Sequence, residues 1–114
     1  MTILMSAQRL PQHCRTWGDG RATDCLITTI LDRDPLVRGV VVTALGALKD
    51  RRAVEPLSQL LAKDSDHSVR AMAATSLGQI GDPRAIDALT GALSDDYPSV
   101  RDSARGALSV IPRR

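Results

Sequence analysis

The sequence predicts an all-α fold, an α-α superhelix in which about three and a half antiparallel helical hairpins stack into a solenoid. One motif recurs with a period of about 31 residues, since Asp64, Val69 and Arg70 have counterparts 32 positions earlier and 31 positions later. Within each copy the apolar residues are spaced as on one face of a helix. Aromatic residues make up only 2% of the 114 residues, so the core must consist of small aliphatic side chains that let helices pack closely.

The repeats divide the chain into three parts. Residues 1–18 are expected to form an irregular or degenerate helix, because Pro11 lies where a helix interior would be and removes a hydrogen bond there. Residues 19–111 are expected to form the repeat domain, and residues 112–114 a short C-terminal tail.

The first helix of each hairpin is predicted at residues 35–48, 67–80 and 98–110. Each begins after a loop that contains aspartate, and Pro35 and Pro98 suit the first turn of a helix, where the missing N–H is not needed. One apolar stripe is expected along each helix, made of Val37, Val41, Ala44, Leu45 and Leu48; Val69, Ala73, Leu77 and Ile80; and Val100, Ala104, Ala107, Leu108 and Ile111.

The second helix of each hairpin is predicted at residues 21–31, 52–62 and 84–93. Apolar residues four positions apart mark one face of each, namely Leu26 with Ile30, Leu57 with Leu61, and Leu89 with Leu93. An aspartate precedes each of these helices, and its short acceptor side chain can cap the free N–H groups: Asp19, Asp50 and Asp82.

The final helix, residues 98–110, has no second helix after it in the chain. A repeat cannot bury its apolar face alone, and terminal repeats usually carry a polar outer surface. Because this helix looks no more polar than the others, we expect its apolar stripe to be covered by a second copy or by another protein, or else the chain to be a fragment of a longer array. The expected interface comprises Val100, Ala104, Leu108 and Ile111.

The repeated residues carry a resemblance to a known family. Asp-x-Asp-x-x-Val-Arg, followed by Ala-x-x-Leu-Gly-x-Ile-Gly-Asp-Pro-Arg-Ala-Ile-x-x-Leu, is clearest over residues 64–93 and resembles the HEAT-like repeat of the phycobilisome-lyase type. The resemblance covers about residues 19–111 and implies a solenoid whose second helices line a concave surface. It also implies a binding scaffold, although some members attach bilin pigments to phycobiliproteins or act on pigment proteins. The fold alone specifies no activity.

Two regular sets of charged residues are the candidate functional positions. The first is a ladder of Asp32, Arg38, Asp64, Arg70, Asp95 and Arg101. It is interpreted either as an anion-binding stripe or, preferably, as carboxylate–guanidinium pairs that join adjacent repeats. The second set, expected on the concave face, comprises Arg21, Asp24, Arg52, Glu55, Gln59, Arg84 and Asp87. Each arginine precedes an acid by three residues, which predicts surface ion pairs worth about 0–1 kcal/mol or alternating charge for a partner.

The sequence offers no constellation for catalysis, a metal or a cofactor. His13, Cys14, Cys25 and His67 lack the CxxC or HxxxH spacing of metal sites, and Gly78 with Gly81 is expected at a helix end rather than in a phosphate loop. A net charge of +2 is too even to indicate nucleic acid. Apolar runs are far shorter than the roughly 20 residues of a membrane span, so we expect a cytoplasmic protein without membrane contact.

The sequence therefore predicts a non-catalytic scaffold that binds another protein through its concave face, its last helix, or both. A homodimer through the last helix is one form of this expectation. An alternative is a subunit or chaperone of a bilin lyase or pigment–protein complex. Nucleic-acid backbone binding is a second alternative, disfavoured because Asp24, Glu55 and Asp87 interrupt the basic face.

Overall fold

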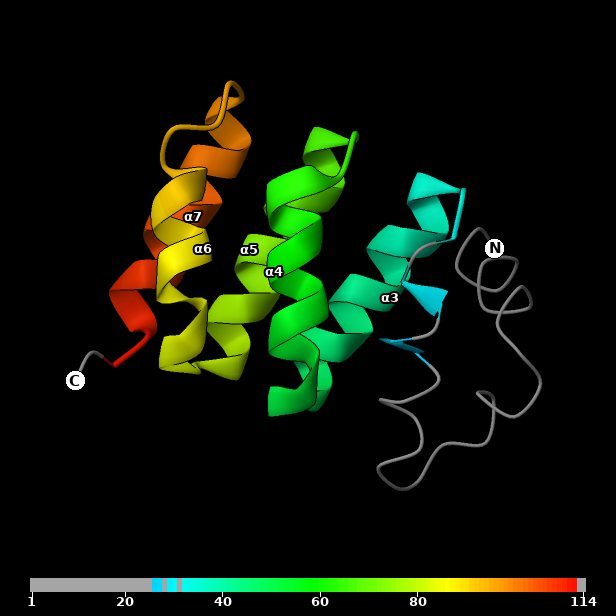
Figure 1. Cartoon of the computed structure of the whole chain (residues 1–114), viewed down its shortest axis with the longest axis horizontal. Coiled ribbons are helices and arrows are strands. Elements are labelled where there is room, and N and C mark those ends of the chain that lie inside the picture. Colours follow the sequence, from blue (N-terminus) through cyan, green and yellow to red (C-terminus); the bar gives the residue numbers. More distant parts are fainter. Residues whose placement is uncertain (1–25, 28, 31, 113–114) are drawn as a thin grey trace.

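The structure, a computed structural model, describes residues 26–27, 29–30 and 32–112 (Figure 1). All regular structure in these residues is helical, which confirms the predicted fold class. In chain order the elements are α3 (Pro35–Leu48), the 3-10 turn η2 (Arg51–Ala53), α4 (Val54–Lys63), α5 (His67–Ile80), the 3-10 turn η3 (Pro83–Ala85), α6 (Ile86–Ala92) and α7 (Pro98–Val110). The bounds of α3, α5 and α7 agree with the predicted first helices.

The helices form two layers. In Figure 1, α4 and α6 lie in front, and α3, α5 and α7 stand behind them in chain order. The long helices of the back layer pack on one another, α3 on α5 and α5 on α7. Across the layers, α4 packs mainly against α5, and α6 against α7. Each second helix thus covers the first helix that follows it in the chain.

This pairing corrects the expectation that the last helix lacks a cover. Val100 and Ala104 are fully buried and Ile111 is 4% exposed, while Leu108 is half-buried, because α5 and α6 already pack on this stripe. The four side chains are therefore core residues of the single chain. They are not an open surface for a partner.

The outer side of α7 is polar at positions where the other two long helices are apolar. Arg105, whose side chain is 74% exposed, occupies the position of the fully buried Val42 and Ala74. Exposed Asp102 likewise replaces Ala71, and the two charged side chains approach each other to 3.6 Å. The expectation that this helix is no more polar than the others is wrong.

The core is a continuous set of small aliphatic residues contributed by both layers. Fully buried members include Val41 and Leu45 of α3, Leu77 of α5, and Leu57 and Leu89 of the front layer. Most residues of the predicted stripes are buried, but Ala44, Ile80 and Leu108 are half-buried and Leu48 is 45% exposed. The last turn of α3 extends past its cover, so Leu48 does not belong to the core.

Aspartate side chains start the helices as the sequence predicts. Asp50 and Asp82 accept the backbone N–H of Arg52 and Arg84 at 2.9 Å, which confirms the predicted caps, and Asp66 caps α5 in the same way. The prediction missed that one 3-10 turn, η2 or η3, precedes the regular part of α4 and α6. Asp19 lies outside the described residues.

Glycine allows the closest helix contacts in the back layer. A Cβ on Gly78 would lie 2.9 Å from both Cα and Cβ of Ala107, and one on Gly46 would lie 2.8 Å from Cβ of Ser76. Gly78 therefore lies in the last turn of α5, near the helix end as expected, at the crossing with α7. Gly81 does end α5, with a left-handed φ of 74°.

Candidate functional site

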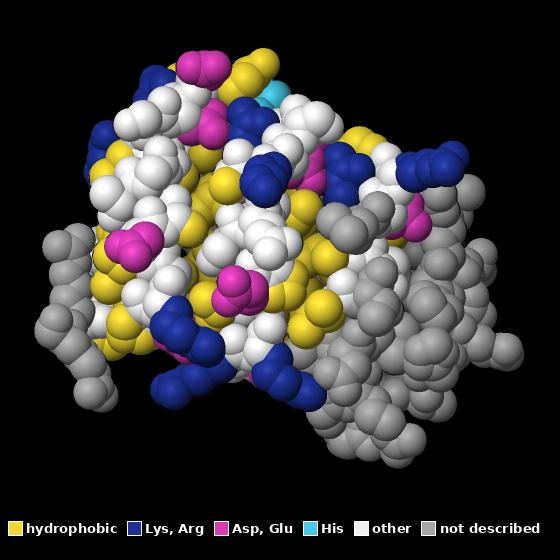
Figure 2. Space-filling model, viewed as in Figure 1, with side chains coloured by type: hydrophobic (Ala, Val, Ile, Leu, Met, Phe, Trp, Pro, Cys, Tyr) yellow, Lys and Arg dark blue, Asp and Glu magenta, His cyan; other side chains and the backbone are white. Residues whose placement is uncertain are grey.

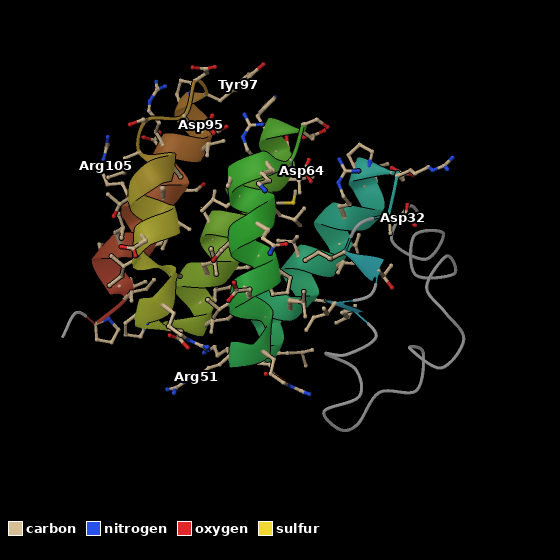
Figure 3. All side chains as sticks on the ribbon, in the orientation of Figure 1. Asp32, Arg51, Asp64, Asp95, Tyr97 and Arg105 are labelled. Carbon is tan, nitrogen blue, oxygen red and sulfur yellow. The ribbon has the colours of Figure 1, made fainter. Side chains whose placement is uncertain are left out.

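The first charged ladder lies along one edge of the stack, where the loops before α3, α5 and α7 meet. Figure 3 shows Asp32, Asp64 and Asp95 spaced along this edge. Arg38 donates from Nε and Nη2 to the Asp64 carboxylate at 2.8 and 3.0 Å, and from Nη1 to the carbonyls of Asp32 and Arg33. One guanidinium thus ties its own loop to the loop of the next repeat.

The same arrangement recurs one repeat later. Arg70 donates to the Asp95 carboxylate at 2.9 and 3.2 Å and to the carbonyl of Asp64 at 2.7 Å. Hydrogen bonding between the two side chains lowers the pKa of Asp95 and raises that of Arg70, while burial opposes both shifts. Arg101 donates to the carbonyl of Asp95 at 2.6 Å. For Arg38 and Arg70 this geometry agrees with the structural interpretation of the ladder, because their guanidinium groups join adjacent repeats.

An aromatic contact that was not predicted from the sequence lies beside the Arg70–Asp95 pair of the ladder. The Tyr97 ring stacks on His67 with centroids 4.1 Å apart and an interplanar angle of 6°, and the Arg70 guanidinium carbon lies 5.6 Å from the ring centroid. Tyr97 stands where the earlier copies have the capping residues Asp34 and Asp66, and it makes no side-chain cap. The tyrosine in place of a capping aspartate was the feature of the sequence from which this contact could have been predicted.

The two pairs of the second set that lie within the described residues do not form as predicted. Arg52 contacts Asp50 at 2.9 Å instead of Glu55, and Arg84 contacts Asp82 at 2.8 Å instead of Asp87. The reason is local: both arginines lie on 3-10 turns, where the capping aspartate two positions earlier is nearer than the acid three positions later.

One of these contacts involves a buried carboxylate. The hydrogen bonds from the Arg84 side chain and backbone lower the pKa of the Asp82 carboxyl, which is nearly buried. Glu55 and Asp87 stay exposed in the first turns of α4 and α6. Arg21 and Asp24, like His13, Cys14 and Cys25, lie outside the described residues.

A groove of about 530 Å³ runs between α4 and the segment that contains Ile27 and Ile30. Ile27, Ile30 and Leu60 give it an apolar floor. Glu55, Gln59 and Lys63 line it as exposed polar residues of α4. Of the predicted recognition residues, the structure therefore brings Glu55 and Gln59 into one groove, and leaves Arg84 and Asp87 outside it.

A second hollow of about 620 Å³ lies on the other face, between α3 and α5. Leu36 and Met72, which are 61% and 42% exposed, line it together with the half-buried Val40. This apolar hollow was not predicted from the sequence, since Leu36 and Met72 do not belong to the apolar stripes that recur along the long helices.

In the described part of the chain, no group of three or more His, Cys, Asp or Glu side chains is placed to hold a metal ion. No helix in the same residues is both long and apolar enough to cross a membrane.

The sequence model of HEAT repeats matches residues 19–109, which include every helix described above except the last residue of α7. The chain belongs to the HEAT-repeat family. The match is to HEAT repeats in general and does not single out the phycobilisome-lyase type. No curated protein matches the chain.

The HEAT-repeat fold is also found in similar solved structures. Human deoxyhypusine hydroxylase, solved in complex with glycerol, is 30% identical and superposes with a TM-score of 0.77, over 82% of this chain and 33% of that protein. This HEAT-repeat chain thus spans about a third of the length of that enzyme. The shared part is an α-solenoid, a fold that hosts unrelated functions.

Proposed function

We propose that this HEAT-repeat protein is a non-catalytic module that binds a segment of another protein in the groove beside α4. The observation that carries the proposal is the groove itself, with Ile27, Ile30 and Leu60 as its floor and polar α4 side chains around them. HEAT repeats generally mediate protein interactions, which supports the same conclusion.

The chemistry of the groove suits a segment with an aliphatic side chain as its anchor. Burying apolar area there contributes about 25 cal/mol per Å², and the volume lies within the roughly 300–1,000 Å³ of ordinary binding pockets. Glu55, Gln59 and Lys63 offer an acceptor, an amide and a cation, which can orient the backbone and flanking side chains of the segment.

The proposal assigns no catalytic step to the chain. Arg38 and Arg70 are engaged in hydrogen bonds that join adjacent repeats, and Asp82 is engaged as a local helix cap. The similar hydroxylase is an enzyme, but a likeness to about a third of its length does not by itself assign a reaction to this chain. A role in a bilin-lyase complex and a cytoplasmic location stay predictions.

Site-specific photo-crosslinking tests the groove. A benzoylphenylalanine placed at Gln59, on the groove, is compared with one at Thr75, which is exposed on the outer face of α5. In lysate of the source cells, the Gln59 probe should give one discrete adduct that maps to a single segment with an aliphatic residue. Equal adducts from both positions, or an adduct from Thr75 alone, would contradict the proposal.

A further inference from the structure

We propose that the turns at the lower edge of the stack form a second binding surface, which takes an acidic segment of a partner protein. This surface, called the basic edge, comprises Lys49, Arg51, Arg52 and Arg84. It lies at the opposite end of the helices from the ladder, as the positions of Arg51 and Asp64 in Figure 3 show. The proposal is independent of the groove, which none of these four residues lines.

The basic edge exposes more positive than negative charge. The side chains of Arg51, Arg84 and Arg52 are 79%, 64% and 51% exposed, and Lys49 is exposed as well. Their carboxylate neighbours, Asp50 and Asp82, are only 24% and 6% exposed. Among the described residues, four cations and two carboxylates lie at the edge, so positive charge is in excess there. Figure 2 shows the dark blue side chains gathered below α4 and α6.

Two guanidinium groups meet around the buried Asp82. Arg84 binds this carboxylate from Nε and Nη2 at 3.1 and 2.8 Å, and Nη2 also donates to the carbonyl of Arg51 at 3.2 Å. The Nε atom of Arg51 lies 4.0 Å from the same carboxylate. Asp82 therefore fixes the guanidinium of Arg84 and keeps that of Arg51 close beside it.

Donors on both arginines stay available to a ligand. Within the described residues, nothing accepts a hydrogen bond from Nη1 of Arg84 or from the Arg51 guanidinium. A guanidinium fork matches the two oxygens of a carboxylate, and a group already held in place loses less conformational entropy on binding. The edge is thus prepared for carboxylate side chains.

Charge around the edge favours an acidic peptide over nucleic acid. Glu55 and Asp87, both exposed, stand in the first turns of α4 and α6 directly above the edge. A phosphate backbone that continued from the edge onto this face would meet both carboxylates. A short acidic segment can contact the edge itself, where exposed cations outnumber exposed carboxylates.

Fluorescence anisotropy with a fluorescein-labelled peptide of twelve glutamates tests the inference at low and at moderate salt. Arg51→Gln is compared with Arg105→Gln, which removes the same charge from a side chain of similar exposure, 74%, at another surface. We expect Arg51→Gln to weaken binding about threefold to fivefold, and Arg105→Gln to leave the Kd unchanged. Both variants should melt at the temperature of the wild type.

Three results would overturn the inference. The first is no binding of the glutamate peptide by the wild type at low salt. The second is equal weakening by the two variants, which would show attraction to overall charge only. The third is tighter binding of a twelve-residue oligothymidylate that Arg51→Gln also weakens, which would assign the edge to nucleic acid. None of them bears on the crosslinking at Gln59.

Discussion

Arg38 and Asp64 form a nearly buried ion pair, with side chains that are 12% and 2% exposed. Taking both charges out of water is costly, and the geometry offsets that cost because Nε, Nη1 and Nη2 each have an acceptor. The pair connects residues 26 positions apart and so joins one repeat to the next. Its effect on stability is therefore expected to be much larger than that of a surface pair.

Replacing Arg38 by alanine should lower the free energy of unfolding by about 3 kcal/mol, because Asp64 would stay buried without its cation. Urea denaturation followed by circular dichroism measures the change. Arg105→Ala is the matched control, since its pair with Asp102 spans 3.6 Å between side chains that are 74% and 73% exposed, and it should change stability by less than about 0.5 kcal/mol. Similar effects of the two substitutions would contradict this account.

The sequence identifies the members of the ladder but does not show which arginine pairs with which aspartate. Equal spacing of Arg38 and Arg70 predicts that they play one role, yet Asp32 and Asp64 are both plausible acceptors by chain position. The stacking of the repeats decides which aspartate pairs with Arg38. It brings the carboxylate of Asp64, in the next repeat, to the guanidinium, while Nη1 donates to the carbonyl of Asp32 in the arginine's own loop. The stack of Tyr97 on His67 also depends on contacts between loops, and was missed for that reason.

At the scale of elements, the helix bounds were predictable because their causes are local. Aspartate caps, first-turn prolines and a terminal Gly81 all act within a few residues of the helix end. The 3-10 turns before α4 and α6 were not predicted, and with them the partners of Arg52 and Arg84. The predicted pairs assumed α-helical spacing, but Arg52 and Arg84 lie in 3-10 turns that precede the α-helices.

Glycine has opposite effects at two helical positions. Gly78→Ala should destabilise the protein by about 1–3 kcal/mol, because the new Cβ would lie 2.9 Å from Ala107 and push α5 away from α7. Gly106→Ala in α7 has open space around it and should stabilise by about 0.5–1 kcal/mol through helix propensity. Thermal and urea unfolding of both variants measure the two changes. A stabilising Gly78→Ala would show that the crossing can relax at little cost.

At the scale of the whole molecule, the way helices pair decides which surfaces are free. The sequence suggested hairpins in which each first helix needs the second helix after it, and so left the last helix uncovered. In the structure α6 covers α7, and α4 covers α5. A repeat period does not show whether a second helix covers the first helix before it or the one after it. That choice depends on which helices are in contact.

The outer side of α7 shows how the apolar packing surface is terminated. Successive long helices present Val42, then Ala74, then Arg105 at one position, and only the first two are buried by a following helix. Asp102 and Ser109 replace Ala71 and Gly78 in the same way. Polar residues here prevent two copies from packing end to end as adjacent repeats do, since charged side chains would lose their water.

This account predicts that the chain is a monomer of 12.2 kDa at tens of micromolar in light scattering. The variant Asp102→Ala/Arg105→Ala/Ser109→Gly, which gives α7 the outer residues of α5, should associate in a concentration-dependent manner because it exposes a face made for helix packing. Arg33→Ala/Asp96→Ala removes the same two charges from exposed loops and should stay monomeric. A dimeric wild type, or a monomeric triple variant, would show that the polar residues of α7 do not control association.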